Sequence, residues 1–403
     1  THQIERMGQV LSQMEEDTKD KTAIAQAILE AYGDESHLPH ILRRVFDAVE
    51  RDAGYRGARP IDEPLLGAYS AEPLPTQATL IATDGSQIYP SRHGAALFYL
   101  INTGTMIWRH GSGAPPTIVS EPYLFYEREY MYAEERGRIS NVTVAARRTV
   151  MEMAALAEHT WHQRNEARPL IALTDGPLLF IMSSEVPERD QLRGIYFSAM
   201  TRILEVQGTL MGYIDRPDSS QIVRLLHLLD IPEEAVTRNA LATSGRMEGL
   251  LDRHVFRGLL GPGERTALFI QMSPQNRDYR REAGETHEIG FFYMNVAASD
   301  QPAHLARIEI PMWVAQDKQL IGKAQALLYL QCQQLVQPYP YILTRADELA
   351  VVKAEESQQL NTMIRVAMTR YGLATEESSK QAAKDAARST KTRYGVQGGR
   401  ADS

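Results

Sequence analysis

The sequence contains very little cysteine. Cys332 is the single cysteine among 403 residues, so the chain can form neither an internal disulfide nor a cysteine-rich zinc site. Long apolar runs are also missing, because no stretch reaches the about 18 consecutive apolar residues of a membrane-spanning helix. The first residues lack the basic-then-apolar order of a secretion signal. These absences predict a cytoplasmic protein that does not associate with a membrane.

An excess of positive charge is the third thing the sequence lacks. It has 43 Lys and Arg against 51 Asp and Glu, for a formal net charge of −8. A protein that coats DNA non-specifically neutralises phosphates with Lys and Arg, so this balance argues against such a coat. It leaves open an enzyme with a local basic groove, or one to which a partner delivers the DNA.

Periodicity and composition divide the chain into parts. Residues 1–54 carry apolar side chains three and four residues apart and are expected to be helical. Residues 55–78 hold four prolines without periodicity and are expected to form a linker. The main domain is expected over 79–371, with a β-rich insertion at about 264–314. Residues 372–403 are polar and basic, which is typical of a disordered tail.

The order of elements in the main domain predicts a mixed α/β fold. Three short apolar runs suggest an antiparallel meander, with a turn at Thr103-Gly104 between the second and third. Helices and buried strands then alternate, which matches the ribonuclease H-like order. The expected strands are 79–83, 95–102, 105–108, 170–174 and 210–214, and the expected helices are 140–165, 189–207, 219–229, 317–336 and 345–371. The charged segment 273–286 is expected to be a mobile loop.

Two aspartates follow buried strands in the same way. Asp84 and Asp175 each end an apolar run and precede a glycine, which lets the backbone turn and leaves the carboxylate uncovered. Strand ends are where α/β sheets bind ligands, and two neighbouring carboxylates repel unless a cation lies between them. Mg²⁺ or Mn²⁺ suits such oxygen ligands. The alternative is that both aspartates only cap turns. A third strand ends at Asp215-Arg216-Pro217.

Two further acidic residues lie on predicted helices. Glu152 lies in an apolar stretch of the helix 140–165, where it could also form an ordinary surface ion pair with Arg148 four residues earlier. Asp347 follows Tyr339-Pro340-Tyr341 at the start of the last helix, where it could equally serve a capping box with Thr344 as the N-cap. Spacing alone does not decide between these roles.

Taken together and in this order, the motifs resemble the NurA nuclease family. They are Asp84-Gly85-Ser86-Gln87, Arg148-x-x-x-Glu152, Leu173-Thr174-Asp175-Gly176-Pro177-Leu178 and Tyr339-Pro340-Tyr341 followed by Arg345-Ala346-Asp347. The resemblance spans about 79–370. It implies a ribonuclease H-like fold, a Mn²⁺- or Mg²⁺-dependent deoxyribonuclease centre, and both 5′–3′ exonuclease and single-strand endonuclease activity. It also implies a homodimer that acts with a HerA-type hexameric ATPase translocase to resect DNA ends in double-strand-break repair.

The resemblance also implies roles for individual residues. Asp84 and Asp175 match the first and second metal-binding aspartates of the family. Glu152 matches the helical glutamate, with Glu158 as a rival, and Tyr339 matches a tyrosine near the active site. Asp347 lies where many family members carry histidine; aspartate is also a hard oxygen ligand, so it is expected to complete the metal site.

Such a set would hydrolyse a phosphodiester by stabilising the charge on the attacking and leaving oxygens with bound cations. Arg92 and His93 follow Asp84 closely and could contact phosphate.

Two other interpretations of the sequence remain. The chain could be a weakly active or inactive scaffold subunit of a DNA translocase complex. It could also be an actin-like nucleotide-binding protein, although Pro177 removes an amide that a phosphate loop would use.

Overall fold

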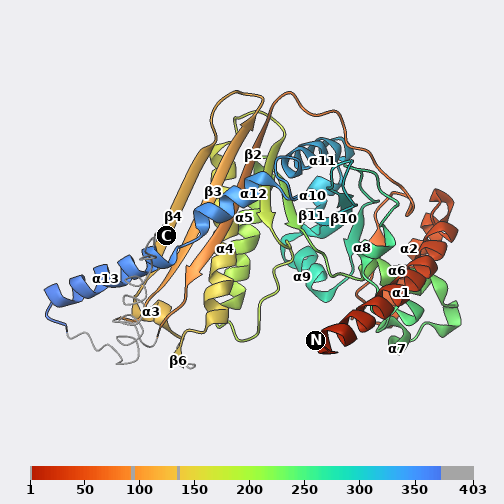
Figure 1. The fold of residues 1–403 in the computed structure, drawn as a ribbon, viewed down its shortest axis with the longest axis horizontal. Coiled ribbons are helices and arrows are strands. Elements are labelled where there is room, and N and C mark those ends of the chain that lie inside the picture. The colour runs from red at the N-terminus through yellow and green to blue at the C-terminus, as the bar shows by residue number, and fades with distance from the viewer. Residues whose placement is uncertain (1, 92–95, 134–136, 374–403) are drawn as a thin grey trace, which may run out of the picture.

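A nine-stranded mixed sheet forms the centre of the chain in a computed structural model that describes residues 2–91, 96–133 and 137–373. Figure 1 shows the strands of this sheet and the helices around them. In sheet order the strands are β1 (Ala58–Pro60), β9 (Phe269–Gln271), β10 (Ile289–Asn295), β11 (Leu305–Pro311), β8 (Thr209–Ile214), β7 (Leu170–Asp175), β2 (Ala78–Ile88), β3 (Tyr99–His110) and β4 (Thr117–Phe125). The predicted tail lies almost wholly outside the described residues, as do Arg92 and His93.

Helices surround this sheet. The longer ones are α1 (His2–Ala31), α2 (Leu38–Arg51), α4 (Asn141–His162), α5 (Arg189–Glu205), α6 (Gln221–Asp230), α9 (Pro274–Ala283), α11 (Lys318–Cys332), α12 (Tyr341–Ala350) and α13 (Ala354–Arg370). The short elements are α3 (Arg128–Met131), α7 (Arg238–Leu241), α8 (Asp252–Val255), α10 (Met312–Ala315), the 3₁₀ turns η1 (Glu35–His37), η2 (Glu233–Ala235), η3 (Gly245–Met247) and η4 (Glu285–His287), and the hairpin of β5 (Tyr132–Ala133) and β6 (Gly137–Arg138).

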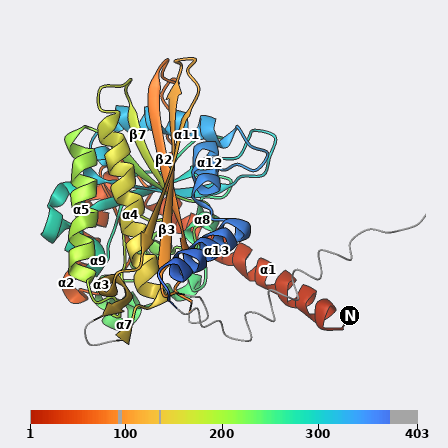
Figure 2. The same ribbon diagram turned by 90° about the vertical axis from the view of Figure 1, so that its left-hand side faces the viewer.

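Five strands confirm the predicted ribonuclease H-like order. β2, β3 and β4 form an antiparallel meander, while β2 pairs in parallel with β7 and β7 with β8. The strands of the meander differ from those predicted: the expected strands 95–102 and 105–108 both overlap the single strand β3, and the third strand is β4, which was not predicted. Along β2 the side chains alternate between the two faces of the sheet. Ile81 packs in the core beneath α4 and α5, whereas Leu80 and Ala82 pack beneath α11 and α12. Figure 2 shows these helix pairs on opposite sides of the sheet.

The remaining strands extend the same sheet. The stretch expected as an insertion, 264–314, provides β9 to β11, and β11 pairs antiparallel with β8. The expected linker, 55–78, provides β1, which pairs with β9. The expected charged loop instead forms α9, capped by Ser273, whose hydroxyl oxygen accepts from the amide of Asn276 at 3.2 Å. The high charge of the segment suggested a loop, but the cap and the hydrogen bonds of the Asn276 side chain to β9 and β10 order it.

The N-terminal helices pack near the β1–β9 end of the sheet, the end away from β3 and β4. The C-terminal half of α1 and all of α2 contribute to a core with α6 and β9. The first part of the region expected to be helical is one continuous helix, α1, whose N-terminal half extends away from the body (Figure 2). None of the helices that the structure describes has the length and apolar composition needed to cross a membrane.

Two local predictions near the site are wrong. Thr103-Gly104 forms no turn but lies inside β3, with Gly104 paired opposite Asp84. The predicted helix 345–371 is two helices, α12 and α13, separated by extended residues. α12 begins directly after Pro340, so Thr344 lies within the helix and is not its N-cap. Proline suits this position because it needs no amide donor there.

Candidate active site

Two adjacent parallel strands bring the first two predicted carboxylates together. In the parallel pair of β2 and β7, Thr83 lies opposite Thr174, so Asp84 and Asp175 are the next residues on neighbouring strands. The backbone amide of Gly85 donates to Asp84 Oδ1 at 2.8 Å. The two carboxylates therefore meet where the parallel pairing of β2 with β7 ends. Asp175 is the last residue of β7, as predicted, but β2 continues past Asp84 to Ile88, so the strand end and turn expected at Asp84-Gly85 are wrong.

Helix α12 adds Asp347 from one face of the sheet. The side chains of Asp84 and Asp347 share a hydrogen bond. The helix comes this close because Gly104, opposite Asp84, has no side chain; a Cβ there would lie 2.4 Å from the Ala350 nitrogen and 2.5 Å from the Ala346 oxygen. The Asn102 amide holds the end of α12 by donating to the Ala350 carbonyl at 2.8 Å.

Helix α4 adds Glu152 from the opposite face. A Cβ on Gly85 would lie only 2.5 Å from Glu152 Oε1, so this glycine makes room for the glutamate. Arg148 Nε lies 2.9 Å from Oε1, but both atoms lack a partner with hydrogen-bond geometry. The rival Glu158 points elsewhere, since it pairs with Arg202 on α5 and with His162.

Tyr339 lies beside the carboxylates. It forms a side-chain hydrogen bond with Asp175, and its ring packs edge-on against that of Tyr213 with centroids 5.3 Å apart. Burial, together with the negative charge of Asp175, holds the pKa of the Tyr339 hydroxyl far above its usual value. The hydroxyl therefore stays protonated and donates to Asp175.

The carboxylates are difficult to ionise together. Burial raises the pKa of Asp84 to about 6, and the negative charges of Asp347 and Asp175 add to this. Burial also raises the pKa of Glu152 to about 7, although the charge of Arg148 opposes the shift. The pKa of Asp175 is raised as well, mainly by burial. A cation placed among these groups would remove the cost of their ionisation.

The donor set has the chemistry of a divalent-metal site. Its four carboxylates supply hard oxygen ligands of the kind that Mg²⁺ and Mn²⁺ prefer, and Glu152 Oε1 is buried without a hydrogen-bond partner. Across the described ranges no three Asp, Glu, His or Cys side chains stand in an arrangement that could already hold one ion. The four carboxylates therefore have the right chemistry for a divalent metal and lie near one another. Their side chains must move to bind the ion.

Asp215 is a further carboxylate at this edge, for which the sequence analysis proposed no role. It follows β8, the strand next to β7, and its negative charge contributes to the raised pKa of Asp175. His304 Nε2 lies 2.9 Å from Asp215 Oδ1. The signal was present, because Asp215-Arg216-Pro217 ends a buried strand just as Asp175-Gly176-Pro177 does.

The raised pKa values predict how stability depends on pH. Between their ordinary pKa values near 4 and about 6 to 7, Asp84 and Glu152 bind more protons in the folded than in the unfolded chain. The free energy of unfolding should therefore fall as the pH rises through this window. We expect urea unfolding in EDTA to show a less stable protein at pH 8 than at pH 5, with a smaller difference for Glu152→Gln. An equal or greater stability at pH 8 would contradict this.

Comparisons with known proteins agree with the family resemblance. The NurA domain model matches residues 78–352. No curated protein matches the chain. Among solved structures, the NurA nuclease from Sulfolobus solfataricus is similar with 13% identity and a TM-score of 0.47, over 82% of this chain and 92% of that one. A NurA structure with manganese has 10% identity and a TM-score of 0.29, over 74% and 92%.

A third solved structure is a Ciona intestinalis endonuclease V bound to DNA. It has 9% identity and a TM-score of 0.27, over 81% of this chain and 98% of that one. These likenesses are distant, and the family assignment depends on the domain match, which covers well over half of the chain and includes Asp84, Glu152, Asp175, Tyr339 and Asp347. The chain belongs to the NurA family.

Proposed function

We propose that this protein is a metal-dependent DNA nuclease that hydrolyses phosphodiester bonds. The observation that carries the proposal is the meeting of Asp84, Asp175, Asp347 and Glu152, which come from two strands and from helices on both faces of the sheet. Asp84 and Glu152 are partly buried and Asp175 and Asp347 are exposed beside them. Four such neighbouring carboxylates destabilise each other when ionised unless a cation binds among them. Membership of the NurA family supports the same activity.

The four carboxylates would hold one or two Mn²⁺ or Mg²⁺ ions. When bound, such ions supply positive charge that stabilises the attacking and leaving oxygens of the phosphodiester. Tyr339 orients Asp175 by donating a hydrogen bond to it. Arg148 orients Glu152 through the 2.9 Å ion pair and is itself held by Gln87, whose Oε1 accepts from Nη1 at 3.0 Å.

The test is a nuclease assay on end-labelled linear DNA. We expect cleavage with Mn²⁺ or Mg²⁺, loss of cleavage in EDTA, and recovery when the metal is added back. Covalently closed duplex DNA, which has no ends, is the matched control substrate and should be spared. Cleavage of linear DNA that continues undiminished in excess EDTA would refute the metal-dependent mechanism.

We further propose a place for this activity in DNA-end resection. By family resemblance, the chain would act as a homodimer with 5′–3′ exonuclease and single-strand endonuclease activity, together with a HerA-type hexameric ATPase. The net charge of −8 supports a need for such a partner, since an acidic nuclease binds free DNA weakly. We expect co-purification with a hexameric ATPase and ATP-stimulated cleavage by the complex. Tight, salt-resistant DNA binding by the isolated protein would contradict this part.

A weakly active scaffold subunit remains the second candidate, favoured by the absence of a ready three-ligand metal site among the described residues. Metal titration separates the two candidates. The nuclease should bind Mn²⁺ at low millimolar concentration or tighter, whereas a scaffold should not.

A further inference from the structure

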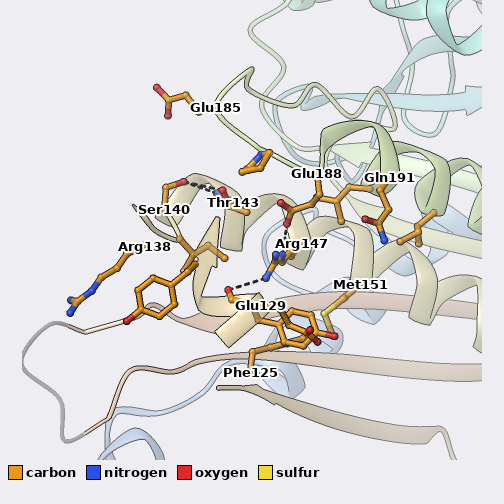
Figure 3. A pocket seen from close by; sticks show the side chains of 16 residues that line it. Phe125, Glu129, Arg138, Ser140, Thr143, Arg147, Met151, Glu185, Glu188 and Gln191 are labelled. Atoms are coloured by element: carbon orange, nitrogen blue, oxygen red, sulfur yellow. Dashed lines mark hydrogen bonds and ion pairs between the residues drawn. The ribbon is translucent and has the colours of Figure 1, made fainter. Parts of the chain in front are cut away.

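A large cavity lies along the N-terminal half of α4, the helix that also carries Glu152. Its volume is about 730 Å³, and it is bounded by α4, α5 and the segment that follows β4. Its lining includes Phe125, Tyr130, Tyr132, Arg138, Arg147 and Met151. Figure 3 shows Arg147, Glu188 and Met151 inside it, while Arg138 extends outward from its edge. We call this cavity the aromatic pocket.

The aromatic pocket shares a helix with the candidate active site. Met151 lines the pocket and is followed directly by Glu152, which faces Gly85 and Asp84. Arg147 lies five residues before Glu152, about 7.5 Å along the helix at a rise of about 1.5 Å per residue. Consecutive residues of a helix point about 100° apart, so Met151 in the pocket and Glu152 in the site lie on adjoining faces of α4.

A rigid aromatic wall forms one side of the aromatic pocket. Phe125 stacks on the buried ring of Tyr99 with centroids 4.5 Å apart, and Tyr130 packs edge-on against Phe125 at 5.3 Å. The Arg147 guanidinium lies 5.5 Å from the centre of the Tyr130 ring. Nη1 of Arg147 also donates to the Tyr99 hydroxyl at 2.5 Å. This framework fixes the rings in place, so little further ordering is needed when a flat ligand stacks on them.

Two tyrosines of the pocket lining are open to solvent. Tyr130 and Tyr132 are 37% and 45% exposed. Exposed aromatic rings that flank a nuclease site are suited to stack with unpaired bases, because every base has a flat face of this kind.

The net negative charge of the pocket lining favours binding of a neutral base over binding of a phosphate. Glu129, Glu185 and Glu188 line it along with Arg138 and Arg147, and the Glu188 carboxylate is paired with Arg147 at 2.5 Å. A net negative lining repels a phosphate, whereas a neutral base is accepted. The carboxylates can also accept hydrogen bonds from the amino groups of bases.

We propose that the aromatic pocket binds an unpaired base of the DNA strand that lies across the carboxylates, so that the protein prefers single-stranded DNA next to the cleaved bond. This rests on the proposed nuclease function and adds a substrate-binding site to it.

The test uses the full chain and a labelled single-stranded oligothymidine at low salt in EDTA. We expect the double variant Tyr130→Ala/Tyr132→Ala to bind about tenfold more weakly, since it removes the rings on which a base would stack. The variant Tyr130→Phe/Tyr132→Phe should bind as the wild type, because it keeps both rings. Tyr371→Ala, which removes an 85% exposed tyrosine elsewhere, is the matched control and should have no effect. Thermal melting checks that each variant is folded.

Hydrolysis of bis(p-nitrophenyl) phosphate distinguishes the pocket from the catalytic centre, because this substrate has no base. We expect the double alanine variant to keep this hydrolysis while losing affinity for the oligonucleotide. Unchanged oligonucleotide affinity would overturn the proposal and favour another occupant, such as an apolar peptide. An equal loss of both activities would also overturn it. Failure of the wild type to hydrolyse either substrate would instead refute the nuclease function.

Discussion

Asp84→Asn is expected to lower the rate of DNA hydrolysis about 1,000-fold or more while making the metal-free protein more stable. Stabilisation of a phosphoryl transition state by a bound cation contributes several kcal/mol, and about 4 kcal/mol corresponds to about a 1,000-fold change in rate. Asparagine keeps the size of the side chain and an oxygen that accepts from the Gly85 amide. It removes the negative charge of Asp84, which the negative charges of Asp175 and Asp347 make unfavourable.

Both effects are measured on one preparation. We expect the free energy of unfolding in EDTA at pH 8 to rise by about 1–2 kcal/mol, because a carboxylate with a raised pKa is then ionised at a cost. The gain should shrink at pH 5, where Asp84 is largely protonated. Asp190→Asn, on the exposed face of α5, is the matched control and should change neither quantity appreciably. A folded Asp84→Asn protein with undiminished cleavage would refute the site assignment.

Gly104→Ala is expected to separate α12 from the sheet and to disable the site without touching an acidic residue. Its Cβ would meet the backbone of α12 at Ala350, Ala346 and Leu349, within 2.4 to 2.7 Å. Backbone atoms cannot rotate away as a flexible side chain does, so the helix must shift and carry Asp347 with it. Overpacking of this kind costs about 1–3 kcal/mol. Urea unfolding should show that loss, and cleavage should fall together with it.

Gly194→Ala is the matched control for this change. Gly194 lies within α5, and a Cβ there would meet nothing within 4 Å. Alanine favours a helix over glycine by about 1 kcal/mol, so the control should be neutral or slightly more stable and fully active. If Gly104→Ala behaves in the same way, the close packing of α12 does not position Asp347.

Two carboxylates of the site could be found from local sequence. Asp84 and Asp175 each follow a short apolar run and precede a glycine, and both facts are visible in a few consecutive residues. The strand end was predicted correctly only for Asp175, because pairing with β3 continues β2 beyond Asp84 to Ile88. The parallel pairing of β2 with β7 brings the two carboxylates together. The alternation of helices and strands over 140–230 was also predictable, because buried strands and amphipathic helices have different periodicities.

Features that depend on contacts between distant segments of the chain could not be predicted from local sequence. Gly104 carries the signal of a turn, yet its role depends on α12, which packs on it from far along the chain. The choice of Glu152 over Glu158 depends on which side of α4 faces Gly85. The aromatic pocket was missed because its walls come from segments that only the fold brings together.

The central claim is that the carboxylates around Asp84 bind a divalent metal, and calorimetric titration with Mn²⁺ tests it most directly. The wild type and Asp190→Asn should bind Mn²⁺ at low millimolar concentration or tighter, whereas Asp84→Asn should lose most of this binding. Equal Mn²⁺ binding by Asp84→Asn and the wild type, or no binding by the wild type, would contradict the account.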